Sequence, residues 1–299
     1  MRQGLPSTPS PTRHWTTPDG LRLAGDSWGD PNRQLVILLH GGGQTRHAWK
    51  GAGEALARAG YHSVAVDARG HGDSQWDPAG AYGPDAMVDD LVVVAENLGR
   101  RRPVLVGASM GGSTSLLAVG EGRIDAAAMV LVDVAPRMEP QGVERIRAFM
   151  SQRPEGFGSL DEVADAVAGY RPGRPRPRTL DGLAKNVRVG TNGRYHWHWD
   201  PGFLEANGDL DALQRRLEAC AGRLTTPTLL VHGALSDVLT DRGASAFLAA
   251  CPNAEYANVA HAAHMVAGDR NDEFVDAVLG FLARTVPADG GAADGGGPP

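Results

Sequence analysis

The chain has 299 residues, of which 42% are hydrophobic, and its formal net charge is −6. This length allows one large buried core with room for an insertion, and the negative charge argues against a nucleic-acid partner. No apolar run approaches the roughly 20 residues of a membrane-spanning helix, so we expect no membrane partner either.

The chain contains only two cysteines, Cys220 and Cys251, and they lack metal-ligand spacing. This usage is typical of a reducing compartment without a structural metal. The first 12 residues are polar and Pro-rich and have no apolar core, so they do not resemble a secretory signal. We therefore expect a cytoplasmic protein with no cofactor and no metal, whose oligomeric state the sequence leaves open.

Strand and helix patterns alternate along most of the chain. A Pro-Asp-Gly turn at 18–20 predicts an antiparallel hairpin of residues 14–17 and 21–28. The later apolar runs predict buried strands at 35–39, 62–66, 104–106, 127–132, 228–231 and 255–259. Periodic segments predict helices at 49–59, 85–98, 113–119, 242–250 and 273–284. This order indicates a mostly parallel sheet with helices on both faces.

The alternation is interrupted between residues 137 and 222, where the patterns are helical and no buried strand is convincing. Ser159-Leu-Asp-Glu162 is a capping box that predicts one helix start. We interpret 137–222 as a helical cap, inserted into a core formed by 13–136 and 223–285. The ends, 1–12 and 286–299, are expected to be disordered.

Two features of the cap invite functional interpretations that we do not favour. The arginine- and proline-rich stretch 171–178 is predicted to be a solvated loop. Residues 195–199 alternate aromatic side chains with His196 and His198. Because no further ligands lie near these two histidines in the sequence, we predict aromatic packing here and no metal site.

The motif Gly107-Ala-Ser109-Met110-Gly111 lies between a predicted buried strand and a predicted helix. Such a sharp turn holds its central residue in a strained conformation and needs glycines two residues away on both sides. We predict that Ser109 is a nucleophile. A dinucleotide-binding turn is disfavoured, because Ser109 stands where that motif needs the glycine that approaches the pyrophosphate.

A serine nucleophile needs a histidine base and an acid that orients it. In the chain order serine, acid, histidine, the acid follows the strand at 228–231, and we predict Asp237. Asp133, at the end of the preceding core strand, is the alternative. Asp241 is interpreted as the cap of the next helix.

The loop after the last predicted strand contains His261 and His264. We predict His264 as the base and interpret His261 as a hydrogen-bonded loop residue. An oxyanion hole needs two converging N–H groups. We assign one to Met110 and the second to the glycine run after the strand at 35–39, from Gly42 or Gly43.

Together these motifs resemble the serine α/β-hydrolases over about residues 14–136 and 223–284. The motifs that carry the resemblance are His40-Gly41-Gly42-Gly43, Asp67-x-Arg69-Gly70-His71-Gly72-x-Ser74, the Ser109 turn and the loops of Asp237 and His264. The resemblance implies an α/β-hydrolase fold with a mostly parallel eight-stranded sheet, and a Ser-Asp-His triad. Members of the superfamily with an aspartate nucleophile are excluded by Ser109.

We expect an enzyme that cleaves a carboxylic ester, lactone or thioester of a small, largely apolar substrate through an acyl-enzyme. The alternatives are a C–C bond hydrolase or a cofactor-free perhydrolase on the same triad, and a non-catalytic small-molecule binding protein. The cap concentrates large apolar side chains, as pocket linings do. His40, Trp197 and Trp199 are the predicted pocket residues.

Overall fold

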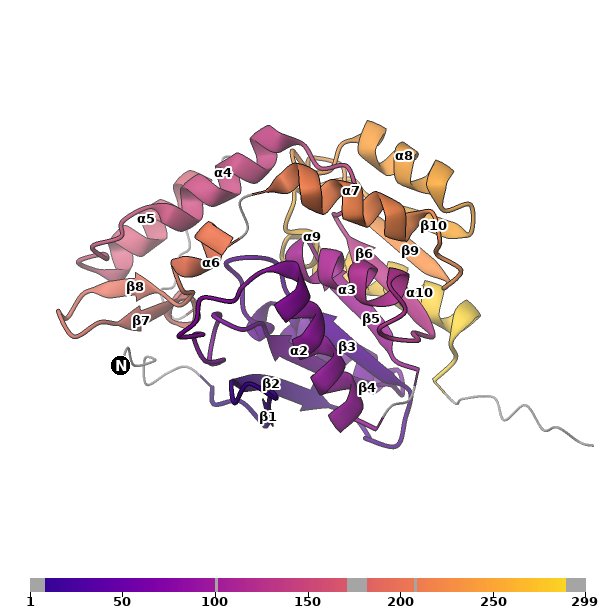
Figure 1. Cartoon of the computed structure of the whole chain (residues 1–299), viewed down its shortest axis with the longest axis horizontal. Helices are drawn as coiled ribbons and strands as arrows, with labels where there is room; N and C mark the ends of the chain where they lie inside the picture. Colours follow the sequence, from indigo (N-terminus) through magenta and orange to yellow (C-terminus); the bar gives the residue numbers. More distant parts are fainter. Residues whose placement is uncertain (1–8, 100–101, 171–181, 207–208, 289–299) are drawn as a thin grey trace, which may run out of the picture.

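The computed structural model describes residues 9–99, 102–170, 182–206 and 209–288 (Figure 1). The arginine-rich stretch 171–178 and most of the two ends therefore lie outside the described residues. Residues 9–12, expected in a disordered end, contact the core, because Thr12 N donates to Gly25 O at 3.0 Å. None of the described helices is long and apolar enough to cross a membrane.

The core is one eight-stranded sheet in the order β1-β2-β4-β3-β5-β6-β9-β10. Its first two pairings, β1 with β2 and β2 with β4, are antiparallel, and the remaining pairings are parallel. The strands are β1 Arg13–Thr16, β2 Arg22–Trp28, β3 Leu35–Leu39, β4 His62–Asp67, β5 Val104–Ala108, β6 Ala128–Val132, β9 Thr228–Gly233 and β10 Ala254–Val259. The predicted sheet and its hairpin are confirmed.

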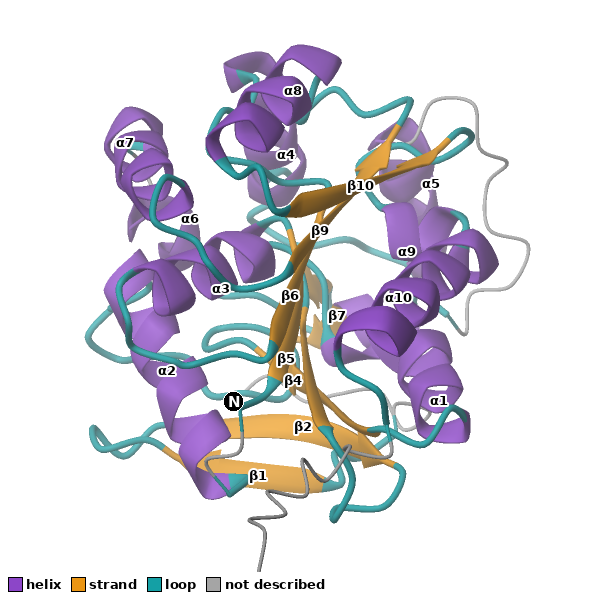
Figure 2. Cartoon of the chain, turned by 90° about the vertical axis from the view of Figure 1, so that its right-hand side faces the viewer, coloured by secondary structure: helices purple, strands orange, loops and turns teal. Residues whose placement is uncertain are grey.

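Helices cover both faces of the sheet, as the alternating pattern predicts (Figure 2). On one face lie α2 and α3, and α1 and α10 lie on the other. The core helices are α1 Lys50–Arg58, α2 Pro84–Asn97, α3 Met110–Gly120, α8 Asp241–Ala250, α9 Val266–Asp269 and α10 Asn271–Thr285. Neighbouring side chains of β5 enter opposite cores: Leu105 packs on the α2–α3 side, while Val104 and Val106 pack on the α1–α10 side.

The segment between β6 and β9, which we call the cap, lies over the carboxyl edge of the parallel strands (Figure 1). Its helices are α4 Pro140–Ser151, α5 Leu160–Tyr170, α6 Gly202–Ala206 and α7 Leu210–Ala221. One half of the capping box before α5 is formed, since Glu162 N donates to Ser159 Oγ at 3.2 Å, while the Glu162 carboxylate accepts from Gly158 N at 3.0 Å. The cap also contains an antiparallel hairpin that the sequence analysis did not predict, β7 Val187–Val189 and β8 Tyr195–Trp197.

Polar contacts join the cap hairpin to the loop after β4. Arg188 of β7 donates to Asp73 Oδ1 at 2.9 Å. Just after β8, Asp200 N donates to Gly70 O at 2.8 Å, and Tyr82 Oη donates to Asp200 Oδ2 at 2.6 Å. This part of the cap is therefore anchored on the 67–82 loop.

The 67–82 loop is also held by Arg46, whose side chain is completely buried. Its guanidinium contacts Asp67 at 2.6 Å, Asp73 at 2.7 Å and Asp26 at 2.9 Å. Asp67 is also completely buried and accepts from Arg46 N at 2.6 Å. One cation thus joins the segment after β3 to the loop after β4.

We expect Arg46→Met to lower the free energy of unfolding by about 3 kcal/mol or more, because it leaves a buried carboxylate without its cation. The control is Lys50→Met, which removes an exposed ion pair with Glu54 on α1 and is expected to cost under about 0.5 kcal/mol. Urea denaturation of both variants measures the difference. Equal losses in the two variants would contradict a structural role for the Arg46 cluster.

Candidate active site

Ser109 lies in a strained turn between β5 and α3, at φ 48° and ψ −112°. The glycines around it are required by packing. A Cβ on Gly107 would clash with the Gly111 and Gly112 backbone, and one on Gly111 would clash with Leu39 O. Ser109 N donates to Val132 O at 3.1 Å, which fixes the turn to β6. The turn expected from the sequence is therefore present at the carboxyl edge of the sheet.

The hydrogen-bond partner of His264 is Asp133. His264 Nδ1 lies 2.7 Å from Asp133 Oδ2. The prediction that Asp237 orients His264 is therefore wrong. Asp133, the alternative acid, forms the hydrogen bond with His264 instead. Because a carboxylate only accepts, Nδ1 carries the proton and Nε2 of the neutral ring is left as an acceptor.

Asp133 is completely buried and follows β6 directly, with φ 51°. Its Oδ1 accepts from Gly233 N at 2.9 Å, and its Oδ2 accepts from the Ser236 hydroxyl as well as from His264. Ser236 Oγ in turn accepts from Val238 N at 3.2 Å. The loop after β9 therefore wraps around the carboxylate of Asp133 and holds it for His264.

Asp237 points away from this arrangement. Its side chain is 41% exposed and forms an ion pair with Arg145 of α4. Asp241 is the first residue of α8, whose N-cap is Thr240. His261 is exposed on the turn before His264. Of the two carboxylates that follow neighbouring strands, β6 and β9, only the one after β6 turns inward.

The glycine loop at 41–43 lies opposite the Ser109 turn, but its amides are not equivalent. Gly41 N donates to Gln44 Oε1 at 3.1 Å, and Gly43 N donates to His71 Nε2 at 3.2 Å. Within the described residues, the Gly42 and Met110 amides have no hydrogen-bond acceptor in the protein. These two remain the candidate oxyanion donors, and the Gly43 amide is already engaged.

His40 was predicted to line the substrate pocket, and the structure places it beneath the glycine loop instead. It is 1% exposed and is absent from the wall of the large cavity described below. Its Nε2 accepts from Ala68 N at 3.0 Å, and its Nδ1 donates to Gly41 O at 2.8 Å. Burial lowers the pKa of His40 to about 4, so the ring stays neutral.

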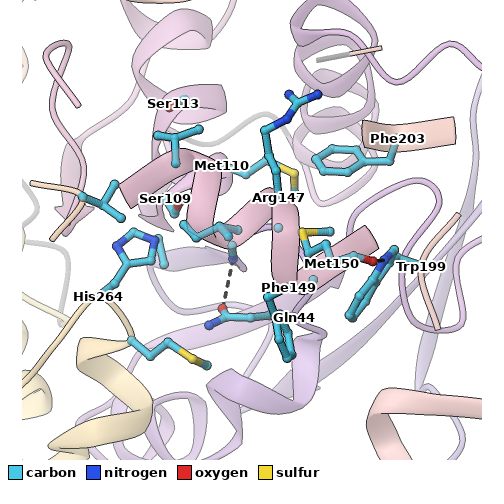
Figure 3. Close-up of a pocket in the computed structure, with 18 of the residues that line it drawn as sticks. Gln44, Ser109, Met110, Ser113, Arg147, Phe149, Met150, Trp199, Phe203 and His264 are labelled. Atoms are coloured by element: carbon cyan, nitrogen blue, oxygen red, sulfur yellow. Dashed lines mark hydrogen bonds between the residues drawn. The ribbon is translucent and has the colours of Figure 1, made fainter. Parts of the chain in front are cut away.

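A cavity of about 1210 Å³ lies between the cap and the carboxyl edge of the sheet, and Ser109, Met110 and His264 are on its wall. Figure 3 shows Ser109 and His264 together on one side, with the imidazole directed toward Ser109, and Trp199 and Phe203 on the other. The wall is mostly apolar, and its large side chains include Met87, Leu117, Met138, Ile146, Phe149, Met150, Tyr170, Leu204, Leu210 and Leu213.

Trp197 and Trp199, which the sequence analysis proposes for the substrate pocket, are on the wall of this cavity, but they are largely covered by other side chains. Only 6% of Trp197 and 2% of Trp199 is exposed. Their rings stack on each other, with centroids 4.9 Å apart, and Trp197 also packs edge-on against Phe157. The aromatic packing predicted for 195–199 is therefore present, and most of the indole surface holds the cap together.

Comparison with known proteins places these features in a family. The sequence model described as "alpha/beta hydrolase fold" matches residues 34–270. The chain is 30% identical to the esterase Rv0045c of Mycobacterium tuberculosis over 220 residues, which are 72% of this chain and 70% of that protein. It is 28% identical over 266 residues to the sn-1-specific diacylglycerol lipase ABHD11 of Mus musculus, covering 85% and 83% of the two chains.

Solved structures agree with the sequence comparisons. The structure of the Rv0045c esterase superposes with a TM-score of 0.73 at 25% identity, over 92% of this chain and 93% of that one. The structure of an E-2-(acetamidomethylene)succinate hydrolase gives a TM-score of 0.80 at 20% identity, over 91% and 98% of the two chains, and shows the shared fold. The chain therefore belongs to the α/β-hydrolase fold family, and it is a hydrolase.

Proposed function

We propose that the protein is a serine hydrolase that cleaves a carboxylic ester, lactone or thioester of a largely apolar substrate through an acyl-Ser109 intermediate. The observation that carries the proposal is the buried Asp133–His264 hydrogen bond beside the strained Ser109 turn. The relatives named as an esterase and a lipase support the same reaction class.

In the proposed reaction, Asp133 keeps His264 protonated at Nδ1, so that Nε2 accepts the Ser109 hydroxyl proton as the oxygen attacks the substrate carbonyl. Asp133 then stabilises the imidazolium that forms. The amides of Gly42 and Met110 donate to the oxyanion of the tetrahedral intermediate. His264 returns the proton to the leaving oxygen or sulfur, and a water molecule, activated by the same ring, releases the acid from Ser109.

The position of the cavity suggests how a substrate lies in it. The cavity extends over the sheet edge, from α7 and α3 on one side to Met265 and α9 on the other. Because His264 must protonate the leaving group, we place that group against the His264 side, where Met265, Val266 and Ala267 line the cavity. The acyl group then extends toward Leu117, Leu210 and Leu213. A cavity of about 1210 Å³ has room for a larger acyl group than acetyl.

Ser109→Ala is expected to lower kcat for a p-nitrophenyl ester by about 10³-fold or more, with little change in melting temperature. A fluorophosphonate probe should label the wild-type protein and leave the variant unlabelled. A protein that binds small molecules without catalysis would show neither turnover nor labelling. Ester turnover by Ser109→Ala close to the wild-type rate would exclude Ser109 as the nucleophile.

Asp133→Asn is expected to lower kcat by about 10³- to 10⁴-fold, because an amide at this position no longer fixes the reactive tautomer of His264. Asp237→Asn is the matched control: it removes a carboxylate of the same type on an exposed ion pair and is expected to change kcat less than about twofold. Steady-state kinetics of the two variants decide between the carboxylates. The reverse pattern would assign the acid to Asp237.

Leu213→Trp narrows the proposed acyl side of the cavity. We expect it to lower kcat/KM for octanoyl and longer esters by about 10-fold or more and to leave the acetyl ester nearly unchanged. Leu213→Met, of similar volume, is the control and should keep the wild-type chain-length profile. A uniform loss over all chain lengths in Leu213→Trp would place the acyl group elsewhere.

A further inference from the structure

Three buried histidines surround the glycine loop that carries the Gly42 amide. His40 follows β3, His71 lies in the loop after β4, and His198 follows β8 in the cap. The ring centroids of His40 and His71 are 5.3 Å apart, and those of His71 and His198 are 5.9 Å apart. None is more than 1% exposed, so each ring must satisfy its two nitrogens inside the protein.

The first peptide unit of the loop is held by His40. His40 Nδ1 donates to Gly41 O at 2.8 Å. In a planar trans peptide the C=O and the following N–H point in opposite directions. The hydrogen bond on Gly41 O therefore sets the direction in which Gly42 N–H points, toward the proposed oxyanion.

The second unit is held by His71. Gly43 N donates to His71 Nε2 at 3.2 Å, and the other ring nitrogen, Nδ1, donates to Arg69 O at 3.1 Å. This contact fixes the peptide that follows Gly42. Rings of the core thus hold the peptide unit that contains the Gly42 amide and the peptide unit that follows it.

The third unit is held from the cap. His198 Nε2 donates to Gly43 O at 3.3 Å, and His198 Nδ1 accepts from Gly72 N at 2.8 Å. The same ring therefore joins the cap to the loop after β4 and to the glycine loop. Gly43 has φ +72°, a conformation that only glycine adopts readily, and the hydrogen bond from His198 restricts the large backbone freedom that glycine has.

The three contacts require neutral imidazoles, because each ring accepts a backbone N–H through one nitrogen, and an imidazolium has no acceptor. Burial lowers the pKa of His71 to about 3 and holds the pKa of His198 well below its ordinary value. A positive charge on one ring would repel a positive charge on its neighbour, and this repulsion also lowers the pKa of His71 and of His198. The donor and acceptor nitrogens assigned above are therefore the stable ones near neutral pH.

We propose that His198 is a positioning residue through which the docked cap completes the oxyanion hole. His198 connects Gly43 to the cap hairpin, and Arg188 and Asp200 anchor the same hairpin on the 67–82 loop. The inference rests on the proposed function, in which the Gly42 amide stabilises the oxyanion. It assigns to a cap residue an effect on kcat that acts through the backbone of the glycine loop.

Two substitutions separate the contacts of His198. In His198→Asn the amide oxygen lies where Nδ1 lies and keeps the Gly72 hydrogen bond, but no group reaches Gly43 O. In His198→Gln the longer amide reaches the position of Nε2 and restores a donor to Gly43 O. We expect His198→Asn to lower kcat by about 10- to 100-fold with KM changed less than about twofold, and His198→Gln to restore most of kcat.

A transition-state analogue and a control variant make the test specific. A boronic acid that forms a tetrahedral adduct with Ser109 should bind His198→Asn more weakly by the factor lost in kcat. His196→Asn changes the other histidine of the same hairpin, whose Nε2 lies 3.3 Å from Asn192 Oδ1 and which has no hydrogen bond to the glycine loop in the described residues, and should leave kcat and analogue binding unchanged. Equal kcat losses in His198→Asn and His196→Asn, matched by equal falls in melting temperature, would overturn the proposal.

Hydrogen–deuterium exchange gives a readout that does not depend on turnover. We expect the peptide covering residues 40–45 to exchange faster in His198→Asn than in the wild type, and at the wild-type rate in His198→Gln. Unchanged exchange in His198→Asn would overturn the positioning role. An absence of wild-type ester turnover combined with faster exchange in His198→Asn would reject the proposed function and retain the contact.

Discussion

The strained turn at Ser109 is the constraint on which the arrangement of the site depends. A non-glycine residue at positive φ costs about 1–3 kcal/mol and persists only where its surroundings enforce it. Here the enforcement comes from close packing, since α3 crosses so near to β5 and β3 that Gly107, Gly111 and Gly112 admit no Cβ. The helix start is thereby pressed against the carboxyl edge of the sheet, where Ser109 and Met110 both line the cavity.

The sequence predicts the core well because its strands are buried on both faces and read as continuous apolar runs, as in β3, β4 and β6. It predicts the acid poorly for a physical reason. Asp133 and Asp237 follow neighbouring strands at the same edge, and their rotation inward or outward depends on distant groups. Ser236 and Gly233 donate hydrogen bonds to Asp133, whereas Asp237 forms an ion pair with Arg145 of the cap.

The cap was the least predictable segment because its elements depend on tertiary contacts. The strands β7 and β8 have three residues each, and their stability comes from packing of Trp197 on Phe157 and from the Arg188–Asp73 ion pair. His198 shows the same limit. The sequence shows that His198 alternates with tryptophans. Only the fold reveals that its ring contacts Gly43, which lies 155 residues earlier in the chain.

The glycine loop also explains why neutral histidines are used at this place. Its peptide groups lie outside any helix or sheet, so their buried N–H and C=O groups need partners of both kinds. A buried arginine only donates and a buried carboxylate only accepts, and either would bring a net charge close to the developing oxyanion. A neutral imidazole supplies one donor and one acceptor without charge. The charged pair of Arg46 with Asp67 is absent from the cavity wall, and it joins the segment after β3 to the loop after β4 without contacting the glycine amides.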